Sequence, residues 1–284
     1  MKEKVAVVID STFYLPKKVI KDNDLKVVSL NVIEGENTYK ELKIDNDFVF
    51  ERLNKKIKLT TSQPAPSEFV SVYEECIKEG YERILVLTLS KGLSGTYQSA
   101  VLGKNMLDNK EIVHVFDTET AAYGNELLVF KLLDLMKETD SVDDLIKPME
   151  AIIERTSLYF TVENLYNLQK GGRLSKTQAF VGTVLRVKPI IKIIDGKLKL
   201  CHKERTNKKL LTYLMGQIHD DPHREGNKLN VRIIQRNSEE NAVALKALVE
   251  EVYENATVSV NDYIGPVFSI HIGDQGFGLA WFFE

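Results

Sequence analysis

The 284-residue sequence has few of the features that mark secreted, membrane-spanning or nucleic-acid-binding proteins. Its two cysteines, Cys76 and Cys201, are isolated, so neither a disulfide framework nor a CxxC metal site is predicted. No segment reaches the run of about 18 apolar residues that a transmembrane helix needs, and the run from Val5 to Ile9 is too short for a signal peptide. A formal net charge of −3 supplies no broad basic surface. These absences predict a cytoplasmic protein with no nucleic-acid partner and no transmembrane segment.

Sequence motifs for cofactors are also missing. Neither the phosphate-binding patterns GxxxxGKS and GxxxxGKT nor the dinucleotide pattern GxGxxG occurs. His219 and His223 have the HxxxH spacing of a metal site, but Pro222 prevents a regular helix from presenting both on one face. The chain by itself is therefore predicted to use no nucleotide or metal cofactor.

The stretch from Ile84 to Ala100 predicts a strand, a loop and a helix in that order. Residues 84–89 are almost all apolar, as in a strand buried on both faces, and a Ser/Gly-rich loop containing Ser94 follows. Apolar runs that end at Ile9 and Phe116 are likewise followed by Asp, Ser or Thr and then by a helical pattern. This repeat predicts an α/β fold with a parallel sheet, whose carboxyl edge carries the polar loops where ligands usually bind.

Between the strand that ends at Ile9 and the strand over residues 84–89, the pattern predicts a further strand from Leu25 to Val32 and a loop or hairpin over residues 35–43. Asp45 is placed as the N-cap of an amphipathic helix.

Three hydroxyl residues in a row, Thr60, Thr61 and Ser62, come shortly before two prolines. Prolines restrict the backbone, and Ser67 is placed to cap the helix that follows. One interpretation of this segment is a capped linker. The other is a rigid set of hydroxyl donors for an anion or a carbonyl group.

The pattern changes beyond Thr156, where a strand over residues 157–162 begins a region of mixed elements. Ser175 and Gln178 form a capping box that predicts a helix to Val187, and Asp195-Gly196 is a two-residue hairpin signal. Two helices alternate with strands after it, the last predicted strand covering residues 267–272. We therefore predict an N-terminal parallel-sheet βα domain over residues 1–156 and a C-terminal α+β domain with a mixed or antiparallel sheet over residues 157–284.

A serine hydrolase is one alternative, because Ser94, Asp117 and His271 occur in the chain order of α/β-hydrolases. The nucleophile elbow GxSxG is not matched, however, since Thr96 stands where the second glycine is needed. Ser94 also lies five residues past the strand, rather than at its tip.

Two cationic candidates are Arg173 and His271. Arg173 directly follows Gly171-Gly172, a C-cap signal for the short helix before it. His271 is followed by a glycine-rich run, and glycine allows a backbone to approach a ligand closely. Histidine is also the side chain whose charge can change near neutral pH.

Several spaced motifs in one order resemble the DegV family of fatty-acid-binding proteins over nearly the whole chain. They are Asp10-Ser11-Thr12, Thr61-Ser62-Gln63-Pro64, Leu93-Ser94-Gly95-Thr96-Tyr97-Gln98-Ser99-Ala100, Asp117-Thr118, Gly171-Gly172-Arg173-Leu174-Ser175, Lys188-Pro189, Asp195-Gly196, Arg205 and His271 with its glycines.

The resemblance implies a protein with no catalysis of its own that holds a long-chain fatty acid between two domains. It implies that the carboxylate is bound near Thr61, Ser62, Ser94 and Gly95. It further implies a substrate-presenting subunit of bacterial fatty acid kinase. In that role an ATP-binding kinase subunit would phosphorylate the carboxylate for phospholipid synthesis. Arg173 and His271 would assist the transfer.

The family usually has His-x-Gly-Pro-Gly, whereas this chain has Asp274 in place of the proline, followed by Gln275. We expect Asp274 to bring an additional carboxylate close to the head group. A lipid-binding sensor or scaffold without a kinase partner therefore remains the alternative function.

Elementary energetics favour such a ligand. Each hydrogen bond to a carboxylate is worth on the order of 1.5–3 kcal/mol. Burial of about fifteen methylenes, at about 0.8 kcal/mol each, contributes roughly 12 kcal/mol before ordering costs. The tail should therefore dominate affinity and the hydroxyl groups should fix orientation.

Overall fold

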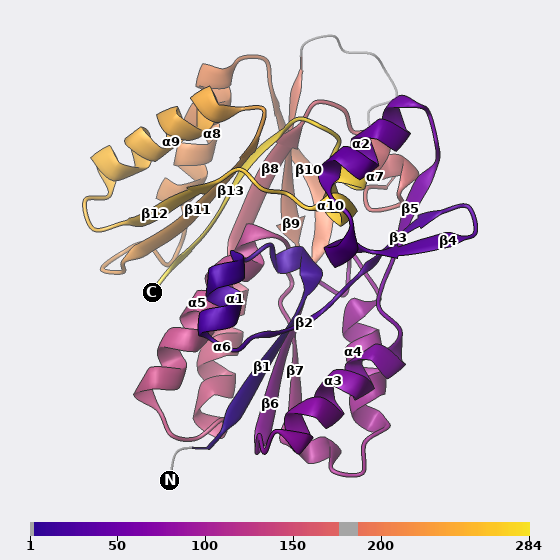
Figure 1. The fold of residues 1–284 in the computed structure, drawn as a ribbon. Helices are drawn as coiled ribbons and strands as arrows, with labels where there is room; N and C mark the ends of the chain where they lie inside the picture. Colours follow the sequence, from indigo (N-terminus) through magenta and orange to yellow (C-terminus); the bar gives the residue numbers. More distant parts are fainter. Residues whose placement is uncertain (1–2, 176–186) are drawn as a thin grey trace.

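The computed structural model describes residues 3–175 and 187–284, and this part of the chain forms three β-sheets with helices around them (Figure 1). Most of the helix predicted between Ser175 and Val187 lies outside the described residues. No helix of the described chain is both long and apolar enough to span a bilayer.

The first sheet is parallel, as the βα repeat predicts, with strand order β2-β1-β6-β7. Alternate residues of its apolar strands point to opposite faces, so each face needs its own cover. One face packs on α3 and α4, and the other on α5 and α6 with α1 nearby (Figure 1). The bounds are β1 (Val5–Asp10), β2 (Lys26–Val28), β6 (Arg83–Thr88), β7 (Val113–Asp117), α1 (Lys17–Asp22), α3 (Pro66–Lys78), α4 (Thr96–Asn105), α5 (Tyr123–Glu138) and α6 (Asp143–Arg155).

The second sheet is mixed, with strand order β10-β9-β8-β13-β11-β12. Only β11 and β12 pair in parallel, and Asp195-Gly196 forms the predicted hairpin turn between β9 and β10. One face packs on α8 and α9, and the other joins the hydrophobic cluster of α5 and α6. The bounds are β8 (Ser157–Val162), β9 (Lys188–Ile194), β10 (Lys197–Glu204), β11 (Leu229–Arg236), β12 (Thr257–Asn261), β13 (Gly276–Phe283), α8 (Asn207–His219) and α9 (Glu239–Val252).

A third, antiparallel sheet was not predicted. The stretch Leu25 to Val32, expected to be one strand, divides into β2 of the parallel sheet and β3 (Asn31–Glu34) of the small one. β3 lies between β4 (Asn37–Lys40) and β5 (Leu59–Ser62), so the capped-linker interpretation of residues 60–67 is wrong in part. The predicted N-cap Asp45 is confirmed, because its carboxylate accepts a bond from the third residue of α2 (Asn46–Asn54).

The predicted cap Ser67 is wrong. Helix α3 begins at Pro66, and the side chain of Glu68 accepts a hydrogen bond from the amide of Ala65. Proline at the first helical position needs no amide partner, and with Ala65 as the N-cap the helix begins two residues earlier than a Ser67 cap would place it.

The predicted strand over residues 267–272 is also wrong, because these residues form helix α10 (Pro266–Ile272). The strand lies further on, as the fully buried β13 at the middle of the mixed sheet. Its glycines serve strand packing: a Cβ on Gly278 would lie 2.5 Å from the Tyr159 carbonyl oxygen. α10 instead packs against α2, α7 (Tyr166–Lys170), β3 and β5, next to the small sheet (Figure 1). The domain boundary at residue 156 stays a prediction.

Candidate functional site

A central cavity lies where the three sheets meet. It contains about 920 Å³ of space free of atoms, a figure that includes open solvent at its mouth. Its apolar wall comes from the loops that follow the strands of the parallel sheet, including the residue before β3, and from the mixed sheet, α7 and α10. Representative members of this wall are Leu30, Leu89, Leu158, Ile193, Ile234 and Phe268.

A polar cluster of five side chains interrupts this wall. Four separate elements supply it: β5, the loop before α4, the turn after α7, and α10. Its members are Thr61, Ser62, Ser94, Arg173 and His271. The structure thus brings together every predicted site side chain from distant parts of the sequence. Gly95 is the exception: it does not line the cavity and lies at the N-cap of α4 against the side chain of Gln63.

His271 enters the cluster from the last turn of α10 and is buried. Its Nε2 lies 2.9 Å from the Thr61 hydroxyl oxygen. Burial, and then the positive charge of Arg173, lowers the pKa of His271 to about 4, so the imidazole is neutral at pH 7. A Cβ on Gly171 would lie 2.5 Å from His271 Nδ1, so glycine there permits the ring to pack closely on α7.

Arg173 is the cation of the cluster. Its Nε donates to the carbonyl oxygen of Leu93 (3.1 Å) and its Nη1 donates to the carbonyl oxygen of Gly171 (2.6 Å). Among the residues that the structure describes, no carboxylate forms an ion pair with it. Burial lowers the pKa of Arg173, but a guanidinium stays charged in proteins. An unbalanced positive charge therefore faces a mostly apolar cavity.

The serine hydrolase arrangement is not formed. Ser94 Oγ lies 2.9 Å from the Thr96 hydroxyl oxygen. The Asp117 carboxylate accepts a hydrogen bond from the backbone amide of Lys91 and forms an ion pair with the Lys91 ammonium group. His271 bonds to Thr61 instead of Ser94. The three side chains thus have separate partners, and among the described residues neither His271 nor Asp117 forms a hydrogen bond with Ser94.

The expectation that Asp274 adds a carboxylate next to the head group is wrong. Its side chain is 57% exposed and does not line the cavity. It accepts hydrogen bonds from the guanidinium of Arg236, and its carbonyl oxygen accepts one from Asn237. The residue therefore fastens the loop after α10 to the end of β11.

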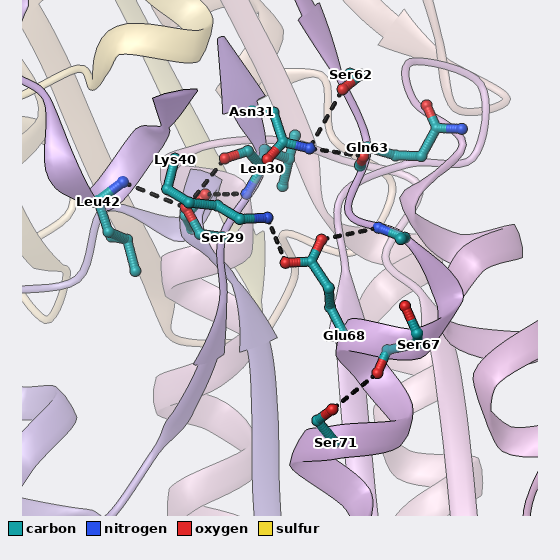
Figure 2. Close-up of polar contacts among 12 residues, drawn as sticks. Ser29, Leu30, Asn31, Lys40, Leu42, Ser62, Gln63, Ser67, Glu68 and Ser71 are labelled. Carbon is teal, nitrogen blue, oxygen red and sulfur yellow. Dashed lines mark hydrogen bonds and ion pairs between the residues drawn. The ribbon is translucent and has the colours of Figure 1, made fainter. Parts of the chain in front are cut away.

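Two buried polar residues next to the cavity are absent from the sequence prediction. Glu41 accepts hydrogen bonds from the Ser11 hydroxyl, the Tyr14 hydroxyl and the Val267 amide, so it holds the start of α10. Asn31 on β3 bonds to Ser62 and Gln63 at the end of β5 (Figure 2). Neither belongs to a recognisable motif, because their partners are distant in the sequence.

Within residues 3–175 and 187–284, no three or more His, Cys, Asp or Glu side chains gather as a metal ion would require. The fold and cavity define a class of protein in which a parallel-sheet half and a mixed-sheet half enclose an apolar pocket with a cationic polar cluster.

Comparison with known proteins assigns this architecture to a family. The family model described as "Uncharacterised protein, DegV family" matches residues 4–284. The chain belongs to the DegV family. It is 34% identical to Protein DegV of Bacillus subtilis over 283 residues, which covers 99% of each chain.

Solved structures of relatives have the same fold. A fatty-acid-binding DegV family protein from Thermus thermophilus superposes with a TM-score of 0.88 at 28% identity and full coverage of both chains. DegV from Bacillus subtilis, described as a fatty acid binding protein, has a TM-score of 0.84 at 32% identity, covering 99% of this chain and 100% of its own. A DegV lipid binding protein from Thermotoga maritima has a TM-score of 0.85 at 27% identity, with 99% and 98% covered.

Proposed function

We propose that this protein binds a long-chain fatty acid in the central cavity, with the carboxylate at the polar cluster and the tail along the apolar wall. The observation that carries the proposal is Arg173, whose unbalanced guanidinium opens onto an apolar pocket. A buried charge without a counter-ion is costly, and a carboxylate ligand supplies the missing charge. Relatives with the same fold are described as fatty-acid-binding proteins.

In this proposal the hydroxyl groups of Thr61, Ser62 and Ser94 donate to the carboxylate and Arg173 neutralises it. His271 contributes a neutral imidazole, since its pKa of about 4 leaves it uncharged. Gly95 is omitted from the set because it does not line the cavity.

Native mass spectrometry of the purified protein tests the proposal. The expected result is a bound species with the mass of a fatty acid, or its appearance after palmitic acid is added to delipidated protein. Protein that is free of ligand and also takes up no added fatty acid contradicts the proposal.

We further propose that the protein acts in the bacterial cytoplasm as the lipid-binding subunit of a fatty acid kinase. A separate ATP-binding subunit would phosphorylate the carboxylate, with Arg173 stabilising charge on the transferred group and His271 assisting. The support is the family resemblance together with the position of these side chains in the polar cluster. The test is ATP-dependent formation of acyl phosphate when the loaded protein is mixed with a candidate kinase subunit. Tight fatty acid binding without acyl phosphate from any such subunit favours a lipid sensor or scaffold.

A further inference from the structure

Asn31 is a buried polar residue behind the polar cluster, with 7% of its surface exposed. It begins β3 and lies opposite Ser62 in the β3–β5 register. Its Nδ2 donates to the Ser62 hydroxyl oxygen (3.2 Å) and to the Gln63 carbonyl oxygen (3.1 Å), as Figure 2 shows. A single amide thus supports two consecutive residues at the end of β5.

The chemistry of these partners settles which terminal atom of the Asn31 amide is nitrogen. A backbone carbonyl oxygen only accepts hydrogen bonds, so the amide atom facing Gln63 must be the donor. The same nitrogen faces the Ser62 hydroxyl, so Ser62 accepts from Asn31. Within residues 3–175 and 187–284, the Ser62 side chain has no other hydrogen bond, so its hydroxyl proton is not donated to any of these residues.

Ser62 lines the cavity, where an unused hydroxyl proton can be donated to a ligand. We propose that Asn31 is a positioning residue that orients the Ser62 hydroxyl as a hydrogen-bond donor and so selects a carboxylate head group. The inference rests on the proposed fatty acid binding and adds a source of head-group selectivity. Asn31 itself touches no ligand in this scheme.

The selectivity follows from the hydrogen-bond donors and acceptors that each head group has. An ionised carboxylate only accepts hydrogen bonds, so it benefits fully from a hydroxyl held as a donor. A fatty alcohol both donates and accepts, so it can bond to Ser62 whichever way the hydroxyl points. Loss of Asn31 should therefore weaken binding of the acid and leave binding of the matched alcohol nearly unchanged.

The test compares tetradecanoic acid with 1-tetradecanol by calorimetric titration of delipidated full-length protein. Asn31→Leu keeps a similar size and removes the donor; the expected result is 5- to 20-fold weaker acid binding and less than a twofold change for the alcohol. Asn241→Leu is the matched control. Asn241 is also buried and donates to a serine hydroxyl, Ser238, but lies at α9, and its replacement should change neither affinity.

A double-mutant cycle tests whether Asn31 acts through Ser62. If it does, Asn31→Leu combined with Ser62→Ala binds the acid no more weakly than Ser62→Ala alone. Losses that multiply, or equal losses of acid and alcohol, overturn the proposal. If the leucine variant does not fold, Asn31→Thr repeats the test. The single hydroxyl proton of threonine cannot be donated to both the Ser62 hydroxyl oxygen and the Gln63 carbonyl oxygen.

The wild-type titration separates this inference from the function on which it rests. Failure of the wild-type protein to bind tetradecanoic acid refutes the proposed function. If the wild-type protein binds tetradecanoic acid but Asn31→Leu changes the affinities for the acid and the alcohol equally, only the positioning role of Asn31 is refuted.

Discussion

The polar cluster and the apolar wall of the cavity are built in different ways. The polar cluster has five side chains from four elements, and contacts such as His271 with Thr61 and Arg173 with Leu93 hold it in place. The wall is a broad surface of side chains from several layers, continuous with the hydrophobic clusters that stabilise the fold. For the proposed fatty acid ligand, this difference predicts that the wall supplies most of the affinity and that the polar cluster supplies orientation and head-group selectivity.

The largest expected effect is on the wall. Ile234→Trp places a bulky side chain in the cavity and displaces several methylenes of the ligand tail. At about 0.8 kcal/mol per methylene, loss of five costs about 4 kcal/mol, or roughly a thousandfold in affinity. Calorimetry should show this loss equally for tetradecanoic acid and 1-tetradecanol, with Ile234→Val as the control near wild type. A loss confined to the acid would contradict the division between wall and cluster.

The second expected effect is on the pH dependence of stability, through the buried carboxyl group of Glu41 behind the wall. Burial raises the pKa of Glu41 to about 7. The folded state therefore holds this proton more tightly than the unfolded state, whose glutamate has an ordinary pKa of about 4.5. The stabilisation is complete below the unfolded pKa and is lost as pH rises through about 7. Burial raises the pKa of Asp10 to about 6, which acts in the same direction.

Urea unfolding at pH 5 and pH 8 measures this effect. The wild-type protein should lose about 2–3 kcal/mol of unfolding free energy more than Glu41→Gln between the two pH values, at about 1.4 kcal/mol per pKa unit. Identical pH dependence in both proteins would show that Glu41 does not titrate in this range.

The third effect is on the charge of the polar cluster. Arg173→Met removes the guanidinium, and the expected cost of about 2 kcal/mol corresponds to about 30-fold weaker binding of tetradecanoic acid. Binding of 1-tetradecanol should change little, as titration of both ligands will show. Lys170→Met, at the exposed end of α7, is the matched control and should bind both ligands as the wild type does. Equal loss of both ligands from Arg173→Met would assign the arginine a structural role only.

The smallest effect concerns the partner of His271. Thr61→Val keeps the shape of the side chain and removes the hydroxyl next to Nε2, so acid binding should weaken about fivefold, or about 1 kcal/mol. Thr60→Val is the control, since the neighbouring Thr60 is exposed and does not line the cavity. Equal behaviour of the two variants in the same titration would remove Thr61 from the proposed head-group site.

Local patterns were sufficient for much of the architecture. The apolar runs before Asp10, Ser90 and Asp117 predicted the parallel strands, and Asp195-Gly196 predicted a hairpin, because the signal and the structure lie within a few residues of each other. Thr61, Ser62, Ser94, Arg173 and His271 could be named as site candidates from motifs, and all line one cavity.

Tertiary contacts decided the rest. The apolar stretch after Gly265 suits a strand or a helix; Pro266 and the hydrogen bond from Val267 to Glu41, 226 residues away, favour the helix that carries His271. Asp274 pairs with Arg236 outside the cavity, and Asn31 meets Ser62 only because β3 and β5 pair. The sequence by itself thus determined where the parallel strands and the hairpin lie and which side chains are candidates for the polar cluster, since both depend on neighbouring residues. Only the folded chain decided the wall of the cavity and the groups that orient the cluster, since these depend on which distant segments come together.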